Sequence, residues 1–433
     1  MKAKILELKA FLFTSFWFLP ILIIFAWWVL SFLTVYLDSS SGLWINIPYL
    51  SFLEWSVDSY RQILSTISSS MISLAGLVFS ITLVALTLAS GQFGSRILKN
   101  FMSNRLNQIV LGSYLATFTY CLLTLRIIRS ENYIDFFPDI SIFVALISAL
   151  ANIILLIFYI HHVALSIQAD TLLKEIYEEL SLNLKKLENK KDSKEASMDE
   201  NIELGRFEIS LTKYKHISEI VAITWGYITH IDREKLMSIA SDEDILLRVL
   251  KISGDFSILW SSLIQISAKK MLDPDILQAL TNCISISKTR SPLWDIKFSL
   301  QQLVEIAVRA LSPGINDPFT ALSSLSRIFS FLWELSTYKM PNIVHWDDKK
   351  NPRIIFQELT YWELIELSLT QIRHYAKESP FVLKEMSENL EQLSKLDIID
   401  DFDSEIKAHL RATKKVLSKF SNEFLYYDVW AKT

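Results

Sequence analysis

The sequence predicts a membrane protein that is mainly α-helical, with four transmembrane helices followed by a cytosolic α+β domain. The chain has 433 residues, of which 51% are hydrophobic, and its mean hydropathy is +0.29. That is more apolar than an ordinary soluble protein of this size. The apolar residues gather in long runs within the first 160 residues, whereas the remainder is rich in charge.

Four apolar segments are long enough to cross a bilayer core of about 30 Å. They are residues 11–37, 63–89, 109–128 and 139–160. Lys and Arg residues concentrate before the first segment, between the second and third, and after the fourth. Because cytoplasmic loops carry the excess of Lys and Arg, both termini are expected in the cytoplasm. Residues 1–160 are therefore predicted to form the transmembrane domain.

The charged remainder divides into four predicted parts. Residues 161–188 keep helical apolar spacing without Pro or Gly, which predicts that the fourth span continues as one helix. Residues 189–204 are charged and poor in apolar residues, and we expect a mobile loop. Residues 205–270 are predicted to form a small ββαββ module, and residues 271–433 a helical domain.

The ββαββ order rests on strand, turn and cap signals. Apolar β-rich runs at 217–224 and 227–231 flank Trp225-Gly226, which predicts a hairpin or bulge. Asp232 is expected to cap a short helix. Two further runs, at 245–252 and 256–264, flank a Ser-Gly-Asp turn. Beyond this module, helical periodicity predicts helices near 274–288, 295–311, 318–337, 353–377, 379–396 and 402–424.

Charge and cysteine content exclude two classes of protein. The net charge of −4 indicates no general affinity for nucleic acid. Cys121 is expected inside the membrane and Cys283 in the cytosolic domain, so the two should not form a disulfide.

A line of small, mostly polar residues follows one face of the second segment. Steps of three and four residues keep side chains on one face of a helix. The predicted pore-lining residues are Thr66, Ser69, Ser73, Gly76, Ser80 and Thr87, and Leu83 and Ser90 complete this hydroxyl stripe.

The hydroxyl stripe has two interpretations. Small residues let membrane helices pack closely, with hydrogen bonds of about 0.6–2 kcal/mol across the contact. Alternatively, several copies of this helix surround a water-filled path, which uncharged hydroxyls would line without strong ion selectivity. The four segments hold no central charged residue, which disfavours a proton-coupled transporter.

Residues 312–321 form the sharpest local pattern, Ser-Pro-Gly-Ile-Asn-Asp-Pro-Phe-Thr-Ala. One interpretation is structural: Pro and Gly end a helix, Asp317 caps the next helix, and Pro318 lies in its first turn. In the other, free N–H groups at the helix start bind an anionic ligand. The candidate ligand-binding residues are Arg309, Gly314, Asn316 and Asp317.

Catalytic and metal-binding patterns are weak throughout the sequence. The seven His residues form no HExxH or paired-Cys pattern, and no phosphate-binding loop or serine elbow occurs. We therefore expect no catalytic or metal site and do not expect an enzyme, and the sequence identifies no cofactor.

The sequence resembles a bacterial family of predicted membrane proteins of unknown function. The stretch 309–321, which reads Arg-Ala-Leu-Ser-Pro-Gly-Ile-Asn-Asp-Pro-Phe-Thr-Ala, is similar to a signature of that family. Residues 301–307, 78–86, 89–96 and 226–232 carry further similarity. The resemblance implies a bacterial inner-membrane protein with four spans and a cytosolic domain, and it supplies no activity.

Two functional hypotheses follow from these patterns. The first is an oligomeric channel, with a Ser/Thr-lined second helix and a cytosolic domain that gates it or senses a ligand. The second is a membrane-anchored sensor or scaffold whose cytosolic domain binds a protein or small molecule while the membrane helices conduct nothing. The expected partners are the lipid bilayer, further copies of the chain, and an ion or small-molecule ligand.

Overall fold

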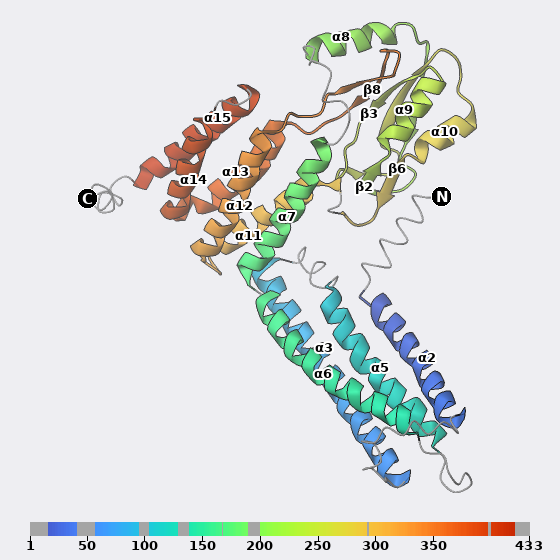
Figure 1. Cartoon of the computed structure of the whole chain (residues 1–433). Coiled ribbons are helices and arrows are strands. Elements are labelled where there is room, and N and C mark those ends of the chain that lie inside the picture. Colours follow the sequence, from blue (N-terminus) through green and yellow to red (C-terminus); the bar gives the residue numbers. More distant parts are fainter. Residues whose placement is uncertain are drawn as a thin grey trace. The chain divides into compact units, whose positions relative to one another are not determined.

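The computed structural model describes residues 16–40, 57–94, 104–128, 138–166, 168–188, 200–291, 294–396 and 400–420 (Figure 1). The chain divides into two compact units, residues 1–171 and residues 172–433. Three parts of the predictions lie outside the described residues: the start of the first span, residues 189–199 of the predicted loop, and the end of the last predicted helix.

Among its described residues, the first unit contains four helices long and apolar enough to cross a membrane, as predicted. They are α2 (Phe18–Ser40), α3 (Val57–Phe93), α5 (Arg105–Ile127) and α6 (Asp139–Ser166). With 37 residues, α3 is about 55 Å long, well beyond the hydrocarbon core. The chain therefore forms a mainly helical membrane unit.

Helix α5 is the centre of this bundle, packing against α2, α3 and α6. Half of the residues in the most apolar 18-residue stretch of α5 are buried. The corresponding share is 17–28% in α2, α3 and α6. The approach of α2 is close at Gly112, where an added Cβ would lie 2.9 Å from Pro20 Cα and 3.0 Å from Ile23 Cδ1. A glycine is required here because any side chain would push α2 away.

Buried polar side chains join the four helices. The Tyr120 hydroxyl lies 2.9 Å from the Thr34 hydroxyl and donates to the Ser141 carbonyl. The Asn152 amide donates to Thr117 and accepts from Ser113. Because lipid offers no hydrogen-bond partners, polar groups inside a membrane bundle are stabilised by partners from neighbouring helices.

The fourth span does not continue as a single helix through residues 161–188. Helix α6 ends at Ser166, and α7 (Ala169–Glu188) begins after a short link. The Gln168 N–H donates to the Leu165 carbonyl, three residues back, which breaks the helical pattern of bonds four residues apart.

Two β-sheets form the first part of the second unit. The five-stranded sheet has the order β1-β5-β3-β8-β7, and only the β3–β8 pair is parallel. The three-stranded antiparallel sheet has the order β4-β2-β6. The strands are β1 (His216–Val221), β2 (Gly226–Ile231), β3 (Leu246–Val249), β4 (Phe256–Ser257), β5 (Ser262–Ala268), β6 (Ile284–Ser287), β7 (Val344–Trp346) and β8 (Pro352–Phe356).

The observed sheets differ from the predicted ββαββ module in how their strands pair and in how far along the chain the strands extend. Strands β1 and β2 belong to different sheets, so the predicted hairpin at Trp225-Gly226 does not form. Gly226 is instead needed because a Cβ there would lie 2.5 Å from the Ser287 carbonyl oxygen of β6. Strands β6, β7 and β8 come from the region expected to be helical throughout. In particular, the start of the helix predicted at 353–377 is strand β8, whose Ile354-Ile355-Phe356 run suits a buried strand.

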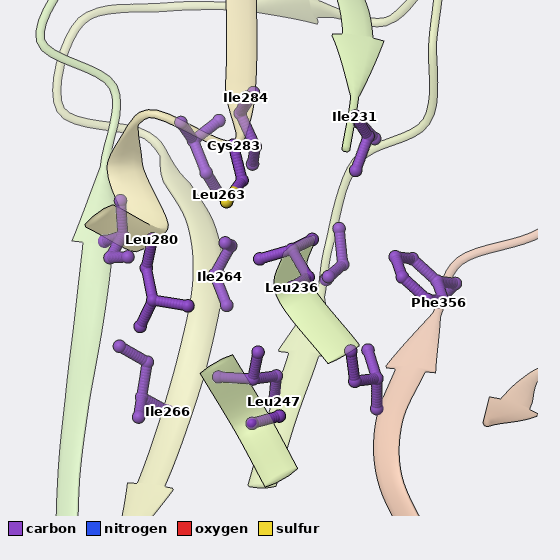
Figure 2. Packing of buried hydrophobic residues seen from close by; sticks show 14 of the residues in the cluster. Ile231, Leu236, Leu247, Leu263, Ile264, Ile266, Leu280, Cys283, Ile284 and Phe356 are labelled. Atoms are coloured by element: carbon purple, nitrogen blue, oxygen red, sulfur yellow. The ribbon is translucent and has the colours of Figure 1, made fainter. Parts of the chain in front are cut away.

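Side chains from both sheets and from α9 (Arg233–Asp242) and α10 (Pro274–Thr281) share one hydrophobic core. Figure 2 shows Leu236 of α9 and Leu280 of α10 converging with Ile264 of β5 and Phe356 of β8. Asp232 caps α9, as predicted, by accepting from the Lys235 N–H. The core also contains Cys283, whose thiol is free, as is that of Cys121.

The second part of this unit is helical and contains α11 (Ile296–Ala310), α12 (Pro318–Ser336), α13 (Tyr361–Tyr375), α14 (Pro380–Leu393) and α15 (Asp400–Leu417). Helix α8 (Glu200–Leu211) packs near β7 and β8.

Helix α7 is fixed to α12 through Glu334. The Ser181 hydroxyl donates to Glu334 at 2.8 Å, and the Lys185 ammonium lies 3.9 Å from the same carboxylate. From Leu172 onward, α7 is thus an integral part of the second unit.

We expect Gly112→Ala to destabilise the membrane unit by roughly 1–3 kcal/mol, because the added methyl group must displace Pro20 or Ile23. Thermal unfolding of the full chain in detergent would measure the effect. The control is Gly91→Ala, since a Cβ at Gly91 meets nothing within 4 Å. Equal melting temperatures for the two variants would contradict the close α2–α5 contact.

Cys283 should resist thiol reagents in the folded protein. Burial raises the pKa of the Cys283 thiol to about 11, so about a thousandth of it is thiolate at pH 8. Maleimide labelling followed by mass spectrometry should show modification only after denaturation. A Met271→Cys variant, at a position 87% exposed, should react at once. Rapid labelling of native Cys283 would show that the core around it is open.

Candidate functional site

The predicted pore-lining residues all lie on the exposed side of α3. The exposed residues of the stripe are Thr66, Ser69, Ser73, Gly76, Ser80, Leu83 and Thr87, and Ser90 is half-buried. The opposite side of the helix packs on the bundle through Leu64, Ile67, Met71, Ala75, Val78, Ala85 and Ala89. Within one chain, the hydroxyl stripe therefore takes no part in helix packing.

Large apolar side chains flank the hydroxyl stripe on both sides. At 100° per residue, Ile72 and Phe79 lie on one side of it, and Leu77 and Val84 on the other. All four are exposed. The only charged residues of α3 are Asp58 and Arg61, in its first turns. Beyond the exposed Asp58 in the first turn, the outer face of α3 is thus an uncharged row of hydroxyl side chains between two apolar borders.

The hydroxyl groups of the stripe bond to their own helix. Thr66, Ser69 and Ser73 donate to the carbonyls of Gln62, Ser65 and Ser69 at 2.7–2.8 Å. Thr87 donates to the Leu83 carbonyl in the same way. Such bonds to the carbonyl four residues back satisfy the hydroxyl proton, and the oxygen keeps lone pairs that can accept from water or from another chain.

The candidate ligand-binding residues lie in the turn between α11 and α12. The Asp317 carboxylate accepts from the Thr320 N–H at 3.1 Å and from the Thr320 hydroxyl at 2.6 Å, and Pro318 starts α12. These bonds hold the pKa of Asp317 below its ordinary value. The capping role is therefore present, and a carboxylate already occupies the positive end of the helix where an anion would bind.

The other three candidates shape the turn. Asn316 has a φ of 48°, so it is the left-handed residue of the turn, and its N–H donates to Ser312. Gly314 is exposed, and a Cβ there would meet nothing within 4 Å. The Arg309 carbonyl accepts from the N–H and hydroxyl of Ser312. The turn brings these residues together, and whether it binds a ligand stays a prediction.

A shallow pocket of about 340 Å³ lies between α11 and α13, a feature that sequence reasoning missed. Trp362 is its largest lining side chain, and the Lys297 ammonium lies 3.5 Å from Glu363. Its remaining lining residues are Gln301, Glu366, Leu367, Thr370 and Gln371. No local motif signals this pocket, since it depends on the packing of two helices distant in sequence. Among the described residues, no group of three His, Cys, Asp or Glu side chains could hold a metal ion.

Comparison with known proteins settles the family. A model of predicted membrane proteins, DUF2254, matches residues 14–392. The chain belongs to this family. The resemblance seen in the sequence is therefore confirmed at the level of the family, as is the architecture of four apolar helices followed by a domain of helices and sheets.

Relatives occur in bacteria and have no assigned function. An uncharacterized protein of Mycobacterium bovis and one of Mycobacterium tuberculosis are each 27% identical over 336 residues, which is 75% of this chain. The chain spans 61% of the length of these relatives. No solved structure matches the chain.

Replacing Asp317 by Ala should cost about 1 kcal/mol of stability at pH 7, the usual value of an N-cap. Because the folded-state pKa of Asp317 is lowered, its contribution is complete above the unfolded pKa of about 3.9, declines below that pH, and is lost as the pH falls through the folded-state pKa. Melting temperatures of the full chain at pH 7 and pH 3.5 should show the difference between wild type and variant shrinking in acid. Asp348→Ala, at an exposed position, is the control. A difference that persists at pH 3.5 would argue against the carboxylate cap.

Proposed function

We propose that this protein is an oligomeric membrane channel in which the hydroxyl stripe of α3 lines a path formed by several copies of the chain. One observation carries the proposal: the stripe faces outward, on the side of α3 opposite its packed face. A polar face that the subunit does not bury is available to further copies or to water. Placed around a common axis, copies of this face would enclose a polar path, with the apolar borders at the contacts between neighbours.

The chemistry of the stripe suits permeation with weak selectivity. Hydroxyl oxygens with available lone pairs can replace part of the water around a cation, and beyond Asp58 in the first turn no charged side chain stands along the outer face of α3 to bind an ion tightly. The same absence of charge favours passive flow over coupled transport.

The soluble unit would act as the gating or ligand-sensing part. Helix α7 follows the fourth span in the chain and is fixed to α12 through Glu334, so a ligand that rearranges the α11–α13 region would act on α7. The turn at Asn316 and Asp317 and the pocket beside Trp362 are the candidate ligand sites. In this proposal both termini lie in the cytoplasm of a bacterial inner membrane, and no catalytic reaction is assigned to the chain.

A membrane-anchored sensor or scaffold is the second candidate. It is favoured by the hydrogen bonds of the stripe hydroxyls to their own backbone, because these bonds let the stripe face lipid or a neighbouring helix without water. The pocket between α11 and α13 would then serve binding alone. Flux measurements separate the two candidates.

Leu in place of both Ser73 and Ser80 should reduce ion flux about tenfold, since the bulkier apolar side chains would narrow and dry the path. The full chain would be reconstituted into liposomes, with K⁺ and Cl⁻ efflux followed by fluorescent indicators. The matched control is Ser70→Leu, an exposed hydroxyl at the flank of the stripe that lies about 60° around α3 from Ser73 and about 80° from Ser80. Equal flux for all variants would contradict a path along the stripe, and no flux above empty liposomes would favour the sensor or scaffold.

The channel also requires assembly. A helix that gives one polar face per subunit can enclose a path only if more than two copies meet around an axis. Native mass spectrometry of the full chain released from nanodiscs should therefore show such an oligomer. The same Ser73→Leu, Ser80→Leu variant tests whether the stripe lies at the centre of the assembly, in which case the copy number or its stability should change. A monomer or a dimer as the largest species would rule out the channel.

A further inference from the structure

Six large apolar residues gather on two neighbouring loops and a short strand of the soluble unit. Ile223 and Trp225 lie between β1 and β2, with exposed fractions of 73% and 50%. Ile258 and Trp260 lie between β4 and β5, with exposed fractions of 64% and 71%. Phe256 of β4 and Leu259 are each 46% exposed. We call these six residues the aromatic tip.

Hydrogen bonds and ring contacts join the two loops into one surface. The Trp260 N–H donates to the Ala222 carbonyl, and the Ala222 N–H donates to the Ser261 carbonyl, both at 2.9 Å. The rings of Trp225 and Phe256 lie 6.4 Å apart. The side chains therefore form a single apolar patch although they come from segments more than 30 residues apart in the sequence.

The loop that carries Ile258, Leu259 and Trp260 is a tight turn. The Ser261 N–H donates to the Ile258 carbonyl at 3.1 Å, and Trp260 has a φ of 67°, as the third residue of a type II turn does. The hydroxyls of Ser257 and Ser261 lie 2.6 Å apart and link the two ends of the turn. A preformed turn needs no ordering before it binds, so its apolar side chains are presented at little entropic cost.

The charges around the aromatic tip favour an anionic surface. The exposed Lys288 ammonium lies 5.5 Å from the centre of the Trp225 ring. The nearest acidic residue in the sequence, Asp255, turns back to accept from the Ile252 N–H at 3.1 Å. Trp, Ile and Leu beside a Lys is the composition of segments that lie in the interface of a bilayer.

We propose that the aromatic tip inserts into the interfacial region of the bilayer, with Lys288 at the level of the phosphate groups. Protruding side chains suit a deformable lipid surface, whereas a protein partner would need a matching pocket for each of them. The four spans also hold the soluble unit at the membrane, which raises the effective lipid concentration at the tip. This inference does not depend on whether the membrane unit conducts ions.

The test places an environment-sensitive NBD probe on the tip of the full chain. Cys121 and Cys283 are buried, so a Leu259→Cys variant can be labelled selectively in the native state. In nanodiscs of phosphatidylcholine and phosphatidylglycerol, we expect blue-shifted NBD emission and about a twofold loss of intensity when doxyl-labelled lipids are included. An Ile223→Cys variant on the second loop should behave alike. The Ile223→Cys variant also gives an independent result if the NBD label at position 259 disturbs the fold.

The matched control is Phe319→Cys, because Phe319 is 79% exposed but lies at the start of α12, outside the aromatic tip. NBD at this position should show the emission of a water-exposed probe and no quenching by doxyl lipids. Replacing Lys288 by Glu should weaken quenching at 259, most strongly in phosphatidylglycerol. Water-like emission at both tip positions would overturn the proposal. A blue shift without doxyl quenching would also overturn it, since it would assign the tip to a protein contact.

Discussion

Hydrogen bonding inside a medium without water determines how the membrane unit is built. Tyr120, Tyr159 and Asn152 each reach a second helix from the middle of the bundle, and each finds its partners there. A tyrosine left without a partner in hydrocarbon would cost several kcal/mol, so these contacts allow few alternative rotations of the helices. The inward face of α3 is fixed by the same contacts, since Thr82 and the Val78 carbonyl meet Tyr159.

The outward direction of the hydroxyl stripe follows from that constraint. Once Val78 and Met71 face the bundle, residues about half a turn away, such as Ser73 and Ser80, must face outward. The bundle uses one set of hydroxyls to hold itself together and leaves another set on its surface. This polar surface, which does not pack against the other described helices of the chain, is the basis of the channel proposal.

Features set by local sequence could be predicted, and features set by distant contacts could not. The four apolar helices, the caps at Asp232 and Asp317 and most helices of the second unit follow from apolar periodicity and capping residues. Strand β8 was missed because its parallel pairing with β3 joins segments about 100 residues apart, and its apolar run is too short to separate strand from helix. The Trp225-Gly226 signal correctly separates two strands, β1 and β2, but these strands belong to different sheets.

The candidate sites also combine features that local sequence predicts with features that depend on distant contacts. The sequence placed the hydroxyl stripe on one face of a helix, yet which way that face turns depends on contacts with other helices, such as those of the buried Tyr159 with Thr82 and the Val78 carbonyl. It also grouped Asn316 with Asp317, where the structure adds that the carboxylate is already engaged by Thr320. The pocket beside Trp362 and the aromatic tip arise only when separate segments meet in space.

The division of the chain between Thr171 and Leu172 lies in the first turn of α7, so the chain passes from one unit to the other once. Neither unit interrupts the other in sequence, so each can acquire substitutions, insertions or a different regulatory partner without disturbing the chain path of the other. A protein organised in this way can keep its membrane helices unchanged while the second unit diverges.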